Sequence, residues 1–189
     1  MTLVATPAQT VGPFFHIGCS KLMVADVAGM SAGSACITIQ GRIFDGDGNP
    51  VPDAMIEIWQ ANASGEYTYA ADTRGKAIDP GFRGYGRVAT DQHGNFRFTT
   101  IKPGLTPGPA SSIQSPHLVI SIFMRGLMKR LMSRMYFPDE LANSTDPVLR
   151  LVEPERCGTL IAQKSETSRE SYRWDVHLQG KSETVFFDI

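Results

Sequence analysis

Two short runs of alternating apolar and polar residues, joined by a dense turn, constrain the fold of this chain more than any other feature. The runs cover residues 37–44 and 55–59, and the sequence DGDGNPVPD fills 45–53 between them. A period of two places successive side chains on opposite faces of a strand, while Gly, Asn, Asp and Pro mark turns. The stretch therefore predicts a strand, a tight turn and a second strand. Glu57 lies inside the second, otherwise apolar run, so its carboxylate is expected to have a partner.

Strand signals continue along most of the chain. Residues 84–90 and 96–101 flank the turn sequence DQHGN and predict a hairpin. Further strand-like runs cover residues 117–124, 134–137, 159–162, 172–178 and 183–187. Strands at this spacing with little helix predict an all-β fold, a β-sandwich. Residues 102–116 are rich in Pro, Gly and Ser, and a loop of this length inside a compact fold is typically functional or disordered.

The N-terminal part differs in character from this strand-rich region. Pro7 and Pro13 fix φ and remove backbone donors, so residues 1–18 are predicted to be an extended N-terminal arm. Residues 19–35 fit a short helix or a loop, and residues 35–189 form the predicted sandwich. With 189 residues, of which 42% are hydrophobic, the chain suits a single domain over 1–189.

Composition narrows the possible partners. A net charge of −1 and no dense basic patch argue against nucleic acid as a partner. No apolar run approaches the roughly 20 residues of a membrane span, and the N-terminus lacks a signal-peptide pattern, so we expect a cytoplasmic protein with no membrane partner. The three cysteines are odd in number and form no C-x-x-C pair, which predicts packed thiols rather than disulfides or a zinc cluster.

Several motifs together resemble one enzyme family. The segments WQANASGEY at 59–67 and DPGFRGYGRVATDQHGNFRFTTIKPG at 79–104 are similar to the signature region of the intradiol ring-cleaving dioxygenases. The resemblance covers most of the chain through QTVGPFFH at 9–16, the strand that begins at His117, FMRG at 123–126, RMYFPDE at 134–140 and ETVFFDI at 183–189. The last two segments are similar to the members that cleave protocatechuate and consist of two homologous chains. This chain looks like their α chain, which implies the intradiol type of β-sandwich.

The resemblance also implies where iron would be expected. Catalytic chains of the family hold a non-haem ferric ion with two tyrosinates and two histidines, and an H-x-H pair on a strand puts both imidazoles on one face. The four corresponding positions here are Tyr67, Thr106, His117 and Val119. Two of the four cannot act as such ligands, so these are vestigial positions and the resemblance implies no metal on this chain. Gln114 stands where catalytic chains place an arginine.

The two remaining ligand-type residues also have ordinary structural interpretations. A lone histidine at the start of a strand, such as His117, is more often a hydrogen-bonded structural residue than a ligand. Tyr67 is expected to be a packed or loop-presented phenol. His16, His93 and His177 are scattered along the sequence and form no ligand spacing.

The resemblance assigns this chain to the substrate pocket instead. It implies an active site at the interface with a partner β chain, which holds the Fe(III) and all four ligands, so that no catalytic residue lies on this chain. Thr10, Gly12 and Pro13 of the arm and Arg125 are the substrate-binding residues carried over. The implied reaction inserts O₂ between the two hydroxyl-bearing carbons of protocatechuate and gives 3-carboxy-cis,cis-muconate, in the β-ketoadipate pathway.

Residue chemistry fits these roles. An arginine supplies a permanent charge with fork geometry for a carboxylate. Gly12 permits close approach of the arm to an aromatic ring, and Pro13 keeps the arm rigid. The alternative for Arg125 is a solvated surface or interface charge, like Lys129, Arg130 and Arg134.

Two other functions remain open at this level. One is a stand-alone β-sandwich binding module without enzymatic activity, which explains residues 41–59 but not KPG, FMRG or ETVFFDI. The other is a self-sufficient metalloenzyme with rearranged ligands, against which Thr106 and Val119 argue. An obligate two-chain enzyme further predicts an extensive apolar interface. Candidates for its centre, or for ordinary core, are Phe14, Phe15, Phe186 and Phe187.

Overall fold

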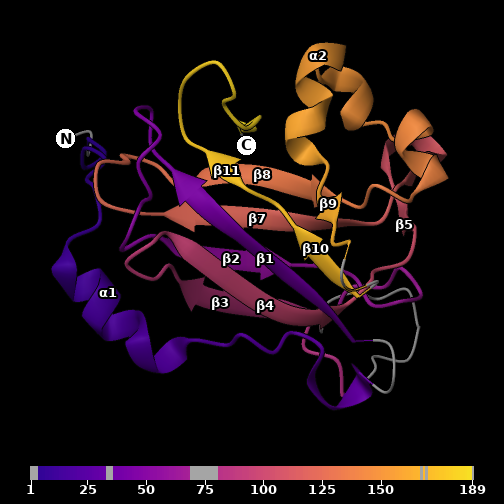
Figure 1. Ribbon diagram of the computed structural model, residues 1–189, viewed down its shortest axis with the longest axis horizontal. Coiled ribbons are helices and arrows are strands. Elements are labelled where there is room, and N and C mark those ends of the chain that lie inside the picture. The colour runs from indigo at the N-terminus through magenta and orange to yellow at the C-terminus, as the bar shows by residue number, and fades with distance from the viewer. Residues whose placement is uncertain (1–3, 33–35, 69–80, 167, 169, 189) are drawn as a thin grey trace.

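Two β-sheets packed face to face form the body of the protein (Figure 1). The computed structural model describes residues 4–32, 36–68, 81–166, 168 and 170–188. In the first sheet the central strand β1 (Cys36–Phe44) pairs antiparallel with β4 (Asn95–Ile101) and parallel with β10 (Ser171–Arg173) and β11 (Val176–His177), and β9 (Gln163–Lys164) pairs with β10.

The second sheet is antiparallel throughout. Its order is β3 (Tyr85–Ala89), β2 (Met55–Trp59), β7 (His117–Phe123) and β8 (Leu131–Tyr136). A separate short pair, β5 (Thr106–Pro107) and β6 (Ile113–Gln114), lies in the segment predicted to be a loop. The helices are α1 (Pro13–Cys19), α2 (Pro154–Cys157) and the 3₁₀ turns Ser20–Leu22, Gly29–Ala32, Pro109–Ser111, Leu141–Thr145, Leu149–Leu151 and Gly158–Leu160. The predicted all-β sandwich is confirmed.

The core follows from the alternation that the sequence displays. Ile39, Ile43 and Phe98 of the first sheet face Ile56, Ile58, Leu118, Ile120 and Ile122 of the second, and each of these side chains is at most 1% exposed. Burial of a side chain of this size contributes about 1.5–3 kcal/mol to folding. The side chains that alternate with these core residues lie on the outer faces of the two sheets.

The partner expected for Glu57 is present on that outer face. Glu57 Oε1 accepts hydrogen bonds from Arg87 Nε and from the Tyr85 hydroxyl, both at 2.7 Å, from the neighbouring strand β3. Burial, together with the Glu57 carboxylate, raises the pKa of Tyr85 to about 12. The prediction of a paired carboxylate is confirmed, and the three cysteines are free, half-buried thiols.

The predicted hairpin between residues 84–90 and 96–101 is wrong. β3 pairs with β2 and β4 pairs with β1, so the turn at 90–94 joins strands of different sheets. The turn at 45–54 likewise joins β1 to β2 across the sandwich. A period of two identifies a strand with one buried face, but it does not identify the strand beside it.

Strand limits toward the C-terminus also differ from the prediction. Residues 158–160 form a 3₁₀ turn, and Ile161 makes only an isolated bridge to Tyr136. The run 183–187 contributes a single bridge, from Phe187 to Met132, and the run 172–178 divides into β10 and β11. The gap between β10 and β11 lies beside Gly41 of β1. There the two backbones approach so closely that an added Cβ on Gly41 would lie 1.8 Å from the Trp174 carbonyl oxygen. β8 begins three residues before the predicted Arg134.

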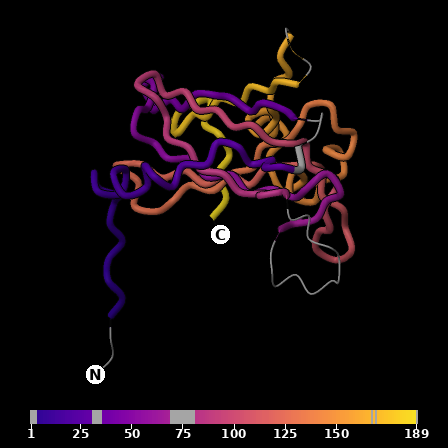
Figure 2. Tube along the Cα trace, turned by 90° about the horizontal axis from the view of Figure 1, so that it is seen from below, coloured from indigo at the N-terminus to yellow at the C-terminus, as the bar shows by residue number. Residues whose placement is uncertain are grey.

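The N-terminal arm is shorter than predicted. Residues 4–12 have no regular secondary structure, and the arm projects away from the body (Figure 2). Residues 13–19 form helix α1, contrary to the extended conformation expected for 1–18. Pro13 occupies the first helical turn, where its missing N–H has no helical partner to lose, so the proline starts the helix rather than preventing it. No helix among the residues that the structure describes is long and apolar enough to cross a membrane.

Candidate functional site

Two glycines bring the first two vestigial ligand positions together. Gly65 has φ +79°, and an added Cβ would lie 1.8 Å from the Leu105 carbonyl oxygen. An added Cβ on Gly104 would lie 2.4 Å from the Ala63 carbonyl oxygen. Because both residues are glycines and carry no side chain, loops 62–67 and 102–106 can come into contact. The contact places Tyr67 beside Thr106.

An Asx turn fixes the first of these loops. Asn62 Oδ1 accepts hydrogen bonds from the backbone N–H groups of Ser64 at 2.9 Å and Glu66 at 3.0 Å. The Asn62 carbonyl oxygen accepts the Gly104 N–H at 2.9 Å. Asparagine side chains favour such turns because they mimic a backbone acceptor. The motif NASGEY is thus a rigid turn that presents Tyr67.

Tyr67 is held between an aromatic ring and a buried hydroxyl. Its ring centroid lies 4.5 Å from that of Trp59 on β2. Burial raises the pKa of Tyr67, while the charge of Arg134 and the Thr106 hydroxyl lower it. Thr106 is 2% exposed, and its Oγ1 makes no hydrogen bond of ordinary geometry within the described part of the chain.

The other two vestigial positions share a face of strand β7. His117 pairs with Tyr136 of β8, and Val119 pairs with Arg134. His117 is 2% exposed and its Nδ1–H donates to the Ser115 carbonyl oxygen at 2.7 Å, which leaves the lone pair on Nε2. Burial, aided by the Arg134 charge, lowers the pKa of His117 to about 4. The imidazole is therefore neutral at pH 7.

A chain of hydrogen bonds anchors Arg134 in this place. Arg134 Nη1 donates to Gln114 Oε1 at 2.6 Å and to the Tyr136 hydroxyl at 3.4 Å. The Tyr136 hydroxyl in turn donates to Asp146 Oδ1 at 3.2 Å, and burial raises the pKa of this phenol. The buried Asp146 carboxylate accepts backbone N–H groups from Ser115, Val148 and Leu149 at 2.8–2.9 Å.

Sequence reasoning missed this network. Arg134 was grouped with the exposed charges that follow β7, but it is half-buried and tied to two side chains. The signal that could have marked it is its position in a strand, directly before the buried Met135 and Tyr136. Asp146 carries no such signal for its role in the network, because the partners that link it there, Ser115 and Tyr136, are 31 and 10 residues away in sequence.

The predicted substrate-binding residues lie together elsewhere. Thr10 Oγ1 accepts the Gly126 N–H at 2.8 Å, which ties the arm to the loop after β7. Pro13 begins α1, and Phe15 of this helix packs on Phe123 with ring centroids 5.8 Å apart. The structure thus brings Thr10, Gly12, Pro13 and Arg125 to one end of the molecule.

Two of these residues face open space. An added Cβ on Gly12 would meet nothing within 4 Å, and its φ of −102° suits any residue. No contact among the described residues therefore requires a glycine there. The Arg125 side chain is 73% exposed and makes one loose ion pair, 3.6 Å to Asp53. A hollow of about 190 Å³ beside it is lined by Asp45, Pro50, Val51, Pro52, Asp53, Met124 and Arg125.

The two groups of residues lie at opposite ends of strand β7. His117 is its first residue, whereas Arg125 follows its last residue, Phe123, by two positions. At a rise of about 3.3 Å per residue, the strand separates the groups by roughly 20 Å. The predicted substrate-binding residues therefore cannot act on a ligand held at this chain's own predicted ligand positions.

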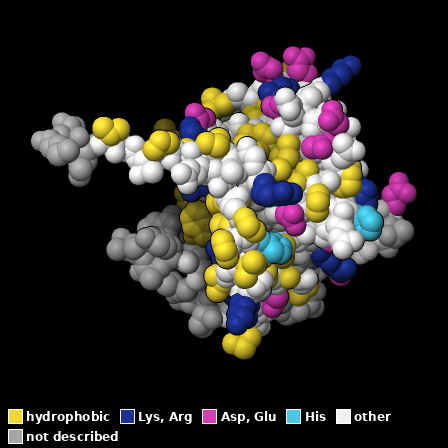
Figure 3. All heavy atoms as spheres, turned by 90° about the vertical axis from the view of Figure 1, so that its left-hand side faces the viewer, with side chains coloured by type: hydrophobic (Ala, Val, Ile, Leu, Met, Phe, Trp, Pro, Cys, Tyr) yellow, Lys and Arg dark blue, Asp and Glu magenta, His cyan; other side chains and the backbone are white. Residues whose placement is uncertain are grey.

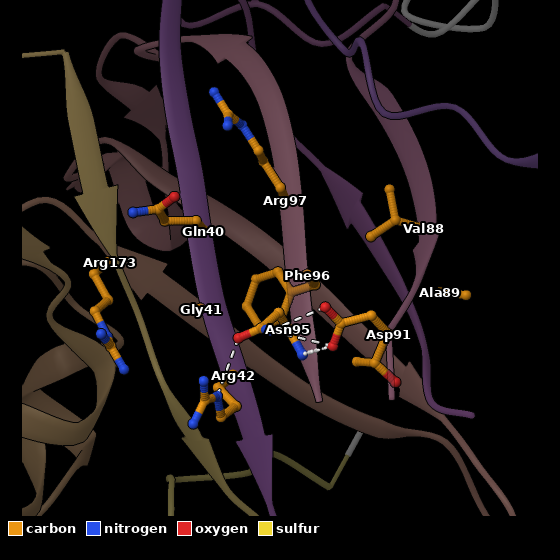
Figure 4. Close-up of a pocket in the computed structure, with 11 residues that line it drawn as sticks. Gln40, Gly41, Arg42, Val88, Ala89, Asp91, Asn95, Phe96, Arg97 and Arg173 are labelled. Atoms are coloured by element: carbon orange, nitrogen blue, oxygen red, sulfur yellow. Dashed lines mark hydrogen bonds between the residues drawn. The ribbon is translucent and has the colours of Figure 1, made fainter. Parts of the chain in front are cut away.

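A groove of about 690 Å³ on the first sheet contains none of these residues (Figure 4). In the register of β4, β1 and β10, Gln40 lies directly between Arg97 and Arg173. Arg42, in the next row, donates to Asn95 Oδ1 at 3.0 Å, and Arg173 pairs with Asp175 at 2.9 Å. Val88 and Ala89 of β3 also line the groove, which is separate from both groups above.

Comparison with known proteins decides the family. The family model described as "Dioxygenase" matches residues 13–180. The chain is 38% identical to the protocatechuate 3,4-dioxygenase alpha chain of Burkholderia cepacia, covering 100% of this chain and 99% of that one. The chain belongs to the intradiol dioxygenase family. The alpha chain of Pseudomonas putida is also 38% identical, and the beta chain of B. cepacia is 36% identical over 78% of this chain and 66% of its own length.

Solved structures of intradiol dioxygenases share the fold. The dioxygenase domain of a dioxygenase–carbohydrate-binding fusion from Streptomyces sp. SirexAA-E superposes with a TM-score of 0.63 at 23% identity, covering 86% of this chain and 89% of that one. The 3-chlorocatechol 1,2-dioxygenase of Rhodococcus opacus 1CP gives 0.64 at 19% identity, with 93% and 68% covered.

The residues at the four ligand positions of this chain cannot hold the iron of the family as its catalytic chains do. Thr106 and Val119 supply neither a phenolate nor an imidazole, and Arg134 is the residue that pairs with Val119 across the sheet. In the described ranges no three His, Cys, Asp or Glu side chains are grouped so that they could hold a metal ion. No described feature favours a stand-alone binding module or rearranged ligands.

Proposed function

We propose that this chain is the α chain of a protocatechuate 3,4-dioxygenase and that it completes the substrate pocket of a homologous β chain. The full-length likeness to two alpha chains supports the assignment. In this proposal the β chain holds the Fe(III) with all four ligands, and no ligand comes from this chain. The two-chain enzyme adds both atoms of O₂ to protocatechuate and opens the ring between the hydroxyl-bearing carbons, giving 3-carboxy-cis,cis-muconate.

One observation carries the division of labour. The residues with a substrate-binding pattern lie about 20 Å along β7 from the vestigial ligand positions, by the usual strand rise. Groups that far from their own chain's remnant site cannot reach it, which supports a pocket that they share with another chain. The exposed arm, the side-chain-free Gly12 and the loosely paired Arg125 are all available to such a chain.

Each residue of this group has a chemical task in the proposal. Arg125 binds the substrate carboxylate through two parallel N–H···O bonds, because guanidinium matches a carboxylate in shape and charge. Gly12 lets the aromatic ring lie close to the arm backbone. Pro13 fixes the direction of the chain into α1, and Thr10 ties the arm to the loop that carries Arg125. The chain thus orients the substrate and supplies charge, while the metal supplies the chemistry from the partner.

The face around the arm suits a partner interface. Hydrophobic side chains gather on it (Figure 3), and among them Phe14 is 84%, Ile17 63% and Met128 57% exposed. Phe186 and Phe187, in contrast, are partly buried and pack against the core clusters. We therefore place the centre of the interface near Phe14 rather than at the C-terminus.

Iron content and ring cleavage test the proposal. The full chain is purified alone and after co-expression with its β homologue, and iron and muconate formation are measured in both. We expect iron and activity only in the complex. Stoichiometric iron in the chain alone, or a complex without activity, contradicts the proposal.

A further inference from the structure

The vestigial ligand positions contain a fixed cation of the protein's own. Directly opposite residues on antiparallel strands share a face, with Cβ atoms about 4.5–5.5 Å apart. Arg134 lies opposite Val119 in this way, and the next pair along the same face is His117 with Tyr136. The Arg134 side chain therefore leaves β8 directly opposite Val119, the position where catalytic chains have a histidine.

Two hydrogen bonds hold the charge there, and a third fixes one of its acceptors. Gln114 Oε1 and the Tyr136 hydroxyl accept from the same guanidinium nitrogen, at 2.6 and 3.4 Å. Asp146 accepts a hydrogen bond from the Tyr136 hydroxyl at 3.2 Å and is itself fixed by backbone N–H groups. Gln114 is itself held, because its Nε2 donates to the Pro107 carbonyl oxygen at 2.8 Å. Since both acceptors are fixed in this way, the guanidinium is not free to swing out as a solvated arginine is.

The charge of Arg134 also acts on Tyr67 and His117, the two ligand-type residues that remain in this chain. This charge counteracts the rise that burial causes in the pKa of Tyr67, and it adds to the fall that burial causes in the pKa of His117. These two come from different elements, the loop after β2 and the start of β7. The charge of Arg134 therefore acts on ligand-type residues from two different elements.

We infer that the Arg134 guanidinium is the resident cation of the place where this family holds iron, and that it keeps a metal ion out of this chain. Loss of two ligands alone leaves Tyr67 and His117 able to collect a stray cation weakly. A fixed positive charge beside them opposes any such binding, since like charges repel more strongly in a half-buried site than in bulk water. The inference rests on the proposed function, which places the iron on the partner chain, and it assigns to Arg134 the task of keeping the iron there.

The test restores the ligands and then removes the charge. The double variant Thr106→Tyr/Val119→His supplies the four-residue set together with Tyr67 and His117. It is prepared in the full chain with Arg134 intact, with Arg134→Gln, and with the charge-conserving Arg134→Lys. The matched control carries Arg173→Gln, which removes an exposed arginine of the first sheet. Bound iron is measured by elemental analysis after Fe(III) loading, and by the visible tyrosinate-to-iron absorption band.

We expect iron content to rise about tenfold on Arg134→Gln and to stay low in the Arg134→Lys and Arg173→Gln forms, as a charge effect requires. Equal iron uptake with Arg134 intact or removed overturns the inference. Should the four-residue forms fail to fold, Val119→His with and without Arg134→Gln is compared for Zn²⁺ affinity, because zinc binds imidazole well. Unchanged affinity there also overturns it.

These outcomes differ from a failure of the proposed function. That proposal fails on the unmodified chain, through iron bound by the chain alone or an inactive complex. The inference fails only when removal of Arg134 leaves metal binding by the restored variants unchanged.

Discussion

Arg125 is the residue on which the proposed specificity depends. Arg125→Ala in the two-chain enzyme removes a charged hydrogen-bond pair to the substrate carboxylate, commonly worth about 1.5–3 kcal/mol, or roughly 10- to 100-fold. We expect KM for protocatechuate to rise by this factor and KM for catechol, which lacks the carboxylate, to change little. Lys129→Ala is the control, since Lys129 is a 79% exposed cation of the same loop. Equal effects on both substrates contradict carboxylate binding.

His117 makes folding stability depend on pH. Its pKa is lowered from 6.5 to about 4 in the folded protein, chiefly by burial. The unfolded chain therefore binds the proton more readily, so the contribution of the neutral imidazole is complete above pH 6.5 and is lost as the pH falls toward 4. A shift of this size corresponds to about 3 kcal/mol. We expect denaturant unfolding of the wild type to lose stability over this window relative to His117→Gln, and parallel pH profiles contradict the assignment.

At the scale of the element, alternation predicted strands well and pairing poorly. The runs 37–44 and 55–59 became β1 and β2 almost residue for residue, because one buried face per strand is written into the sequence. Their partners could not be read from the same pattern, since β3 and β4 each bury a face whichever sheet they join. Helix α1 was missed because proline was taken to extend the chain rather than to begin a helix.

The turn that presents Tyr67 depends on Gly65. Gly65→Ala forces a left-handed backbone onto a residue with a Cβ and places that atom 1.8 Å from the Leu105 carbonyl oxygen. We expect the free energy of unfolding to fall by about 2 kcal/mol or more, as strain and overpacking add. Gly48→Ala is the control, because Gly48 has φ +81° with nothing within 4 Å and so reports backbone strain alone. Equal losses in the two variants in urea titrations contradict close packing of the two loops.

For the molecule as a whole, the site could be predicted only as far as linear motifs extend. The resemblance predicts the four vestigial positions and the four substrate-binding residues, and the structure brings the members of each predicted group together. The resemblance could not give the separation of the two groups along β7, nor the hydrogen bonds that fix Arg134. That hold depends on the register of β8 against β7 and on Asp146, whose partners come from three separate segments.

Association with the β chain should depend on the face that carries the arm. Phe14 is 84% exposed on α1, beside the tie between Thr10 and Gly126, and an exposed phenylalanine at the centre of an interface commonly contributes about 2 kcal/mol or more. We expect Phe14→Glu to weaken the complex at least about tenfold in sedimentation experiments and to leave the stability of the lone chain unchanged, because the side chain is not part of its core. Leu141→Glu, a 93% exposed residue near the opposite end of β7, is the matched control and should leave association intact. If Phe14→Glu associates like the wild type, or if Leu141→Glu weakens the complex as strongly, the partner docks elsewhere and the substrate group around Arg125 faces solvent rather than a β chain.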